Sequence, residues 1–205
     1  EFGLTGTFGD LSVFSFFGNK IITSGEGGAI ASKNKHYIDR ANFLKNQAAV
    51  PGRRFEFDEV GFNFRMTNLQ AAILQAQLEK VDELIQRRAE IFEFYNAAFS
   101  DDENFSLIGG RSEMGISPWM YSLHLSHNYG LAERKDLERH LALHGIESRP
   151  YFQPHSRSGR FASSIRDFHV SNQLADRGLN LPTFAHINQH QLDKVVRIVK
   201  SWRPS

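Results

Sequence analysis

One lysine, Lys20, lies in a segment whose composition is suited to a nucleophilic amine. It follows an aromatic, β-prone run and precedes the glycine-dense turn Gly25-Glu26-Gly27-Gly28, and Ser15 lies five residues upstream. A lysine becomes an imine-forming nucleophile when its surroundings hold the amine partly neutral, and a loop in a cofactor cleft can do this. Most lysines are solvated surface charges, however, and glycines of this kind also make ordinary turns.

Three further blocks with an unusual composition follow in the chain. They are Gly61-Phe62-Asn63-Phe64-Arg65-Met66-Thr67-Asn68-Leu69-Gln70-Ala71-Ala72, then Arg149-Pro150-Tyr151-Phe152-Gln153-Pro154-His155, and finally Ala175-Asp176-Arg177-Gly178-Leu179-Asn180-Leu181-Pro182-Thr183. Together with the lysine segment, these blocks resemble in the same order the signatures of the DegT/DnrJ/EryC1/StrS family of sugar aminotransferases, which use pyridoxal 5'-phosphate (PLP). The resemblance spans nearly the whole chain.

The resemblance implies roles for four residues near the cofactor. Lys20 would hold PLP as an imine and would move protons between substrate and cofactor carbons. Ser15 would donate a hydrogen bond to the cofactor phosphate, which a hydroxyl does without adding charge. Asn63 would contact the phosphate in the neighbouring subunit, and Arg65 would bind a carboxylate or phosphate of the donor or the substrate.

If these roles hold, the active site is composite and the enzyme is at least a dimer, which we expect to be a homodimer. Plainer interpretations remain open. Ser15 would then be a strand serine bonded to the backbone, Asn63 a turn residue and Arg65 a surface arginine.

The block from Arg149 to His155 is expected to bind substrate. A pyrophosphate-linked sugar needs cationic and aromatic contacts, which Arg149, Tyr151 and His155 would supply. The commoner family form has another residue between the proline and the histidine, so this chain departs from it at Pro154-His155. These two residues could equally form a turn with a solvent-exposed imidazole.

The fold class that the resemblance implies is α/β, with the type I fold of aspartate aminotransferase. Residues 1–100 are expected to form the C-terminal half of the PLP-binding large domain, and residues 101–205 a small α+β domain. Family members are much longer and place about half of the large domain ahead of the lysine. The missing half would supply the acidic partner of the pyridine nitrogen, which makes PLP an effective electron sink.

The composition excludes several classes of protein. Of the 205 residues, 40% are hydrophobic and 23% are charged, which is typical of a globular chain, and the formal net charge of +1 gives no reason to expect binding to nucleic acid or an acidic membrane. The absence of cysteine excludes disulfides and thiolate metal sites, and it fits a cytoplasmic location. No apolar run is long enough to span a bilayer. His124 with His127, and His186 with His190, lack a third ligand at metal-binding spacing.

Periodicity and capping signals predict the elements. Thr67 and Gln70 match a capping box that opens a long helix, whose apolar stripe recurs at spacings of three, four or seven as far as Phe99. The other expected elements are strands at 11–17, 28–31, 118–126 and 146–152, helices at 39–47, 133–144 and from Ser171, a loop at 48–57, and a last helix capped by Asn188 with Leu192, Val195, Val196, Val199 and Trp202 on one face.

The predicted function is transfer of an amino group from glutamate to a nucleotide-linked keto-sugar, for surface polysaccharide (such as lipopolysaccharide O-antigen) or amino-sugar biosynthesis. Residues 16–23 look most like the perosamine synthase branch of the family, which aminates C4 of a GDP-linked 4-keto-6-deoxy sugar. One alternative is a PLP-dependent sugar dehydratase, in which a histidine typically replaces the lysine. Another is a truncated, non-catalytic remnant or subunit of such an enzyme.

Overall fold

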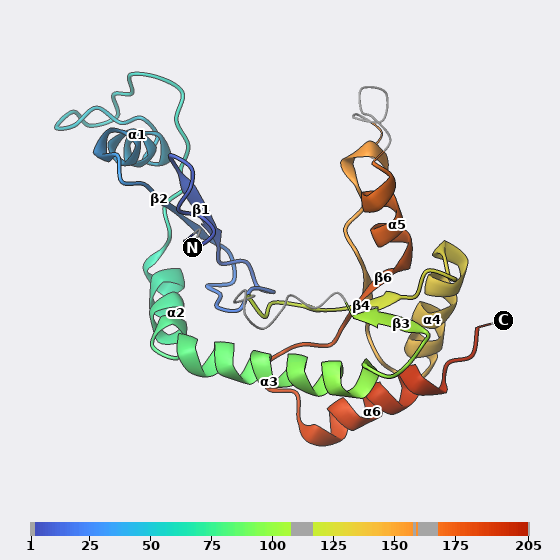
Figure 1. Cartoon of the computed structure of the whole chain (residues 1–205). Coiled ribbons are helices and arrows are strands. Elements are labelled where there is room, and N and C mark those ends of the chain that lie inside the picture. Colours follow the sequence, from blue (N-terminus) through green and yellow to red (C-terminus); the bar gives the residue numbers. More distant parts are fainter. Residues whose placement is uncertain (1–2, 108–116, 158, 160–167, 205) are drawn as a thin grey trace. The chain divides into compact units, whose positions relative to one another are not determined.

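The structure is a computed structural model that describes residues 3–107, 117–157, 159 and 168–204 (Figure 1). The chain divides into two compact units, Glu1–Asp82 and Glu83–Ser205. Each unit has its own strands and helices. No helix in the described ranges is long and apolar enough to cross a membrane.

The N-terminal unit begins with an antiparallel hairpin. Strands β1 (Ser12–Ser15) and β2 (Gly28–Ala31) pair with Ser15 opposite Gly28, and the helix α1 (Lys35–Lys45) follows. The expected strand at 28–31 is confirmed, whereas the one at 11–17 is shorter because Phe16 bonds to the ends of the loop instead of continuing the ladder. Helix α1 begins before the expected residue 39 because Asn34 caps it, its side chain accepting a hydrogen bond from the His36 amide.

The long helix predicted from Thr67 to Phe99 is two helices, α2 (Asn68–Leu78) and α3 (Val81–Phe99). The capping box at Thr67 and Gln70 is confirmed. The last turn of α2 tightens, with the Lys80 amide bonded to the Gln77 carbonyl, and this interrupts the regular helical bonding. The expected apolar stripe is therefore only partly buried: Leu78 and Ile85 are 49% and 40% exposed. The buried side chains of α3 are Arg88, Ile91, Tyr95 and Phe99.

The C-terminal unit is built on a four-stranded antiparallel sheet in the order β3-β4-β6-β5. The strands are β3 (Phe105–Leu107), β4 (Tyr121–Leu125), β5 (Arg149–Pro150) and β6 (Gly178–Leu181), and the helices are α4 (Leu131–Leu143), α5 (His169–Arg177) and α6 (Gln189–Ser201), with a short 3-10 helix η2 (His155–Arg157). The strand expected at 146–152 is reduced to two residues, since Pro150 has no amide hydrogen to extend a ladder.

The hydrophobic core of this unit joins the sheet to α3, α4 and α6. Leu123 and Leu125 of β4 and Leu179 and Leu181 of β6 are almost fully buried in it. The predicted apolar face of the last helix is also there, with Leu192, Val195, Val199 and Trp202 all less than 5% exposed. Because strand side chains alternate, the intervening residues of β4 and β6 point to the other face of the sheet.

The division between the units lies earlier than the expected boundary at residue 100. Ile91, Tyr95 and Phe99 of α3 belong to the core of the C-terminal unit. The hydroxyl of Tyr95 donates to the Pro182 carbonyl at 3.0 Å, and the hydroxyl of Tyr121 donates to Asn96 at 3.0 Å. Most of α3 therefore supports the small sheet.

Candidate active site

Lys20 lies in the loop that joins β1 to β2. The loop is closed at its base by Phe16, whose amide donates to the Gly27 carbonyl at 2.9 Å and whose carbonyl accepts from the Ser24 amide at 3.1 Å. Thr23 adds a side-chain bond to the same Phe16 carbonyl at 2.9 Å. The Lys20 amide donates to the Phe17 carbonyl at 3.0 Å, so its backbone is part of a turn. The lysine is half-buried, in a loop whose ends are held by hydrogen bonds.

The glycine turn after Lys20 contacts the start of α2. The Glu26 carbonyl accepts from the Ser24 hydroxyl at 2.8 Å and from the Gln70 side-chain amide at 3.3 Å. A Cβ at Gly27 would lie 2.7 Å from the Ser24 hydroxyl and 3.0 Å from the end of the Met66 side chain, and the positive φ of 147° also favours glycine. The second sequence block therefore helps to hold the lysine loop.

Ser15 is the last residue of β1 and is exposed. Its hydroxyl oxygen accepts a hydrogen bond from the Phe17 amide at 3.4 Å. An accepting hydroxyl still has its own hydrogen to donate. Ser15 and Lys20 therefore flank the beginning of the same loop, and a phosphate could accept from the serine.

Asn63 and Arg65 lie in an exposed extended segment that is bonded to the C-terminal end of α1. The Phe62 and Phe64 amides donate to the Leu44 and Lys45 carbonyls at 2.8 and 3.0 Å, which satisfies acceptors that a helix end leaves unpaired. Asn63 forms an isolated antiparallel bridge with Asn46. The rings of Phe62 and Phe64 stack with centroids 5.0 Å apart, which is the alternation expected of an extended chain.

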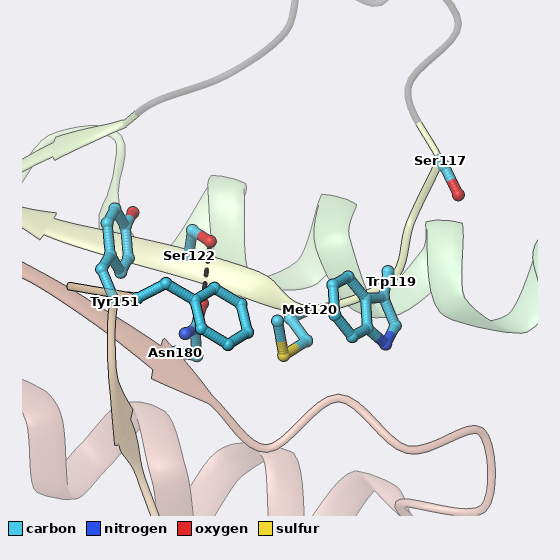
Figure 2. Close-up of a pocket in the computed structure, with 7 residues that line it drawn as sticks. Ser117, Trp119, Met120, Ser122, Tyr151 and Asn180 are labelled. Carbon is cyan, nitrogen blue, oxygen red and sulfur yellow. Dashed lines mark hydrogen bonds between the residues drawn. The ribbon is translucent and has the colours of Figure 1, made fainter. Parts of the chain in front are cut away.

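The C-terminal unit contains a pocket of about 400 Å³ beside β4, β5 and β6. It is lined by Ser117, Trp119, Met120, Ser122, Tyr151, Phe152 and Asn180 (Figure 2). The Trp119 carbonyl accepts a hydrogen bond from the guanidinium of Arg88, which is 8% exposed and whose pKa is lowered by burial. This buried arginine of α3 therefore fixes the backbone at one wall of the pocket.

Tyr151 lies against the backbone of β6. Its amide donates to the Gly178 carbonyl at 3.2 Å, and its ring occupies the space where a Cβ of Gly178 would be. The hydroxyl is buried and has no hydrogen-bond partner among the described residues. Burial raises the pKa of Tyr151. A buried phenol of this kind is suited to pair with a bound molecule.

His124 lies on the same sheet face, opposite Gly178, and its ring centroid is 6.3 Å from that of Tyr151. It is 6% exposed, and its Nε2 atom has no partner among the described residues. Burial lowers the pKa of His124, and the charge of Arg177 lowers it further. Both effects favour the neutral imidazole. Within the described ranges, no three histidine or acidic side chains are grouped so that they could hold a metal ion.

Arg149 is exposed on the edge strand β5, with its guanidinium bonded to Glu147 at 2.8 and 3.0 Å. His155 is exposed in η2 and is not among the residues that line the pocket. The structure thus brings Tyr151 to the pocket but does not bring His155 there.

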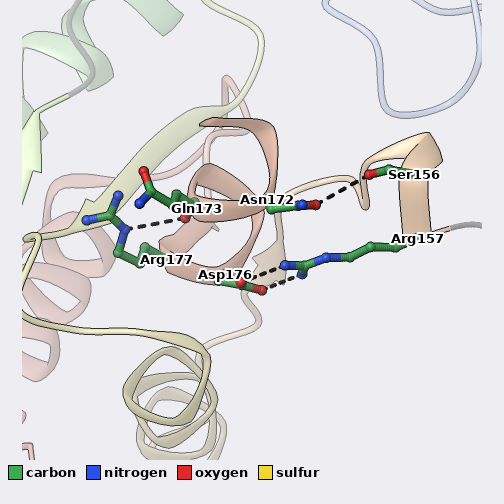
Figure 3. Close-up of polar contacts among 6 residues, drawn as sticks. All are labelled: Ser156, Arg157, Asn172, Gln173, Asp176 and Arg177. Atoms are coloured by element: carbon green, nitrogen blue, oxygen red, sulfur yellow. Dashed lines mark hydrogen bonds and ion pairs between the residues drawn. The ribbon is translucent and has the colours of Figure 1, made fainter. Parts of the chain in front are cut away.

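The helix η2 is bound to α5 by an ion pair that sequence reasoning missed. Arg157 bonds both carboxylate oxygens of Asp176, at 2.5 and 2.7 Å (Figure 3). The Ser156 hydroxyl reaches Asn172 at 3.4 Å. The Arg157 guanidinium lowers the pKa of Asp176. Because the partners are 19 residues apart in sequence, no local spacing identifies this pair.

Nearly the whole chain matches a known protein family. The family model for the DegT/DnrJ/EryC1/StrS aminotransferases matches residues 4–200. The chain belongs to this family. Its members are PLP enzymes, so the family implies the cofactor.

Two curated relatives show how similar the chain is to individual enzymes. The chain is 38% identical over 201 residues to a GDP-perosamine synthase from Vibrio cholerae, covering 96% of this chain and 54% of that protein. It is also 38% identical to a GDP-perosamine synthase from Escherichia coli O157:H7, covering 91% of this chain and 50% of that protein. The chain therefore spans about half the length of the curated relatives it matches.

Solved structures confirm the fold class. The aminotransferase PseC of Helicobacter pylori, involved in pseudoaminic acid biosynthesis, superposes with a TM-score of 0.87 at 22% identity, over 96% of this chain and 54% of that one. The aminotransferase TlmJ from Streptoalloteichus hindustanus also gives 0.87 at 22% identity, over 96% and 53%. The α/β fold expected from the sequence is that of these family members.

Proposed function

We propose that this chain provides the cofactor lysine and the small domain of a PLP-dependent aminotransferase that acts on nucleotide-linked keto-sugars. The observation that most supports this is the position of Lys20, half-buried in a hairpin loop whose base is closed by Phe16. An amine must be held within reach of the reacting carbons to move a proton between them, and a loop held at both ends meets that need.

The residues of the hairpin fit the cofactor. Lys20 offers the amine that an aldehyde requires, and Ser15, whose oxygen already accepts from the Phe17 amide, offers a donor for the phosphate. When bound, PLP supplies an electron sink for the carbon that loses a proton. The Lys20 Nζ atom would take up that proton and return it on the neighbouring carbon.

The proposed substrates are suggested by the names of two relatives. Relatives at 38% identity are named GDP-perosamine synthases, which supports a GDP-linked sugar as the substrate. A 4-keto-6-deoxy sugar as the acceptor and glutamate as the amino donor are further parts of the proposal. Arg149 and Tyr151 are proposed to bind the sugar nucleotide, and Arg65 a carboxylate or phosphate. His155 stays a proposed contact as well. Lys20 is the residue that disfavours the dehydratase alternative.

The proposed assembly is a homodimer with a composite site. Asn63 and Arg65 are exposed in a segment held by main-chain bonds to α1, so both side chains are available to a second copy. Substrates of this class and the lack of cysteine fit a cytoplasmic enzyme.

The test is formation of an imine at Lys20. The full chain is mixed with PLP, its visible spectrum is recorded, and the imine is reduced with borohydride and located by peptide mapping. We expect a yellow absorbing species that is trapped on Lys20. Lys20→Arg should abolish it, and Lys80→Arg, an exposed control lysine, should leave it unchanged. Label scattered over surface lysines, or no band, would contradict the proposal for this chain.

A further inference from the structure

Three polar residues of the C-terminal unit lie in one row across the sheet. In the strand register, Ser122 of β4 is opposite Asn180 of β6, and Asn180 is opposite Arg149 of β5. Side chains of directly opposed residues in antiparallel strands point to the same face. Their neighbours Leu123, Leu179 and Leu181 are in the core, so the row lies on the opposite face.

The first two members of the row meet at the pocket. The Ser122 hydroxyl donates to the Asn180 side-chain oxygen at 2.9 Å (Figure 2). Because this oxygen already accepts a bond, the amide group of Asn180 has chiefly hydrogens to offer to a ligand. The pocket thus has a hydroxyl and an amide side by side on its sheet wall.

The other described residues that line the pocket are mostly aromatic. Trp119, Tyr151 and Phe152 provide ring faces, and none of the described residues that line the pocket has a charged side chain. The Tyr151 hydroxyl is buried without a partner among the described residues. A volume of about 400 Å³ lies within the range of small-molecule sites, which combine apolar walls with a few polar groups. The pocket is therefore suited to a neutral ring with hydroxyl groups.

A positive charge lies at the end of the same row. Arg149 is opposite Asn180, and its side chain is 64% exposed. Its partner in the structure is Glu147, which is itself 76% exposed. An exposed ion pair of this kind contributes little free energy, so the guanidinium can exchange Glu147 for an anionic ligand. Arginine binds phosphate oxygens with two parallel hydrogen bonds.

We propose that this face is the sugar-phosphate subsite, with the neutral sugar ring in the pocket and the adjoining phosphate at Arg149. Ser122 and Asn180 are then residues that determine sugar specificity. The inference rests on the proposed function, because it assigns a part of the substrate to named side chains. It differs from that proposal in requiring no cofactor for its test.

Binding is measured on the full chain by tryptophan fluorescence. The chain has two tryptophans, and Trp202 is 2% exposed in the core, so a ligand in the pocket should change mainly the emission of Trp119. The probe is GDP-mannose, a stable GDP-linked sugar, and GDP, mannose 1-phosphate and glutamate are titrated in parallel. Trp119→Phe should remove the signal.

Three substitutions test the individual contacts. Arg149→Gln should raise the Kd for GDP-mannose and mannose 1-phosphate about tenfold, because a charge-assisted contact is lost. Ser122→Ala should raise it about threefold. Glu147→Gln should lower it about two- to threefold, since the carboxylate that competes for the guanidinium is gone. The matched control is Arg139→Gln, which removes an exposed arginine of α4 and should change nothing.

Several results would overturn the inference. Equal affinity for GDP and GDP-mannose, with no binding of mannose 1-phosphate, would assign the pocket to the base. Binding of glutamate alone, weakened by Arg149→Gln, would assign the face to the amino donor. An Arg149→Gln effect no larger than that of Arg139→Gln would remove the arginine from the site. If the imine forms at Lys20 and no sugar ligand binds, this inference fails while the proposed function stands. If a sugar ligand binds and no imine forms, the proposed function fails for this chain while this inference stands.

Discussion

Gly178 is the residue at which a single added carbon tests the packing of the pocket. An alanine Cβ there would lie 2.2, 2.3 and 2.4 Å from three ring atoms of Tyr151. The backbone of Gly178 has φ −92° and ψ 138°, a conformation that any residue adopts. Gly178→Ala therefore introduces no backbone strain, and any loss of stability must come from displacing the Tyr151 ring.

The size of the effect follows from the distances. Carbon atoms in contact are normally about 3.5–4.0 Å apart, so the ring must retreat by roughly 1.3 Å or more. Tyr151 is bonded through its backbone to the Gly178 carbonyl, which prevents a simple shift of the chain. Inserting a methyl group into a packed site costs about 1–3 kcal/mol. The melting temperature should fall by about 2–4 °C for each kcal/mol.

The assay is thermal and urea unfolding followed by tryptophan fluorescence, to which Trp202 in the core of this unit contributes. Gly159→Ala is the control, because a Cβ there would meet no atom of the described residues within 4 Å. In the background of Tyr151→Ala, Gly178→Ala should cost little, giving a coupling free energy of about 1 kcal/mol or more. If Gly178→Ala destabilises both backgrounds equally, or neither, the close approach of Tyr151 and Gly178 is wrong.

Three further changes test the lysine loop, the η2 ion pair and the Asn63 segment. Gln70→Glu should keep the capping box, because a carboxylate oxygen still accepts from the Thr67 amide, but it removes the hydrogen bond donated to the Glu26 carbonyl. Helix content measured by circular dichroism should persist, while amide hydrogen exchange in residues 16–27 increases. Unchanged exchange would refute the role of Gln70 in holding the loop. Since Arg157 lowers the pKa of Asp176, the pair stabilises the fold above the unfolded pKa of about 3.9, and this contribution is lost as pH falls through the folded pKa. Asp176→Asn should therefore flatten the decline of the free energy of unfolding below about pH 4. An unchanged decline would contradict this role of the ion pair. Gly61→Ala would place a Cβ 2.3 Å from the nearest main-chain atom of the neighbouring turn, and main-chain atoms cannot move aside as a side chain can. We expect the free energy of unfolding, measured by thermal unfolding, to fall by about 1–3 kcal/mol. A stability equal to that of the parent chain would contradict this.

The two units contribute different parts of the proposed reaction. The N-terminal unit holds Lys20 and Ser15 on one hairpin, and the C-terminal unit holds the pocket with Tyr151 and Asn180. In the N-terminal unit many large apolar side chains are exposed, such as Val13 at 78% and Phe64 at 72%. A full enzyme would have to cover such surface, since apolar burial is the main favourable term in folding.

Residue types and spacings along the chain determined much of the local structure. The capping box at Thr67 and the cap at Asn188 depend on bonds between near neighbours, so their residue types and spacings were sufficient to predict them. The lysine loop between an aromatic run and a glycine turn was predicted in the same way. The family followed from the order of four short blocks.

Tertiary structure alone decided the rest. The row of Ser122, Asn180 and Arg149 depends on strand order and register, which pair residues 58 and 31 positions apart. The contact of Tyr151 with Gly178 and the bond from Gln70 to Glu26 likewise join distant segments. Such contacts form when helices and strands pack against one another. The packing free energy is shared by residues that are far apart in the sequence, so no local pattern predicts these contacts.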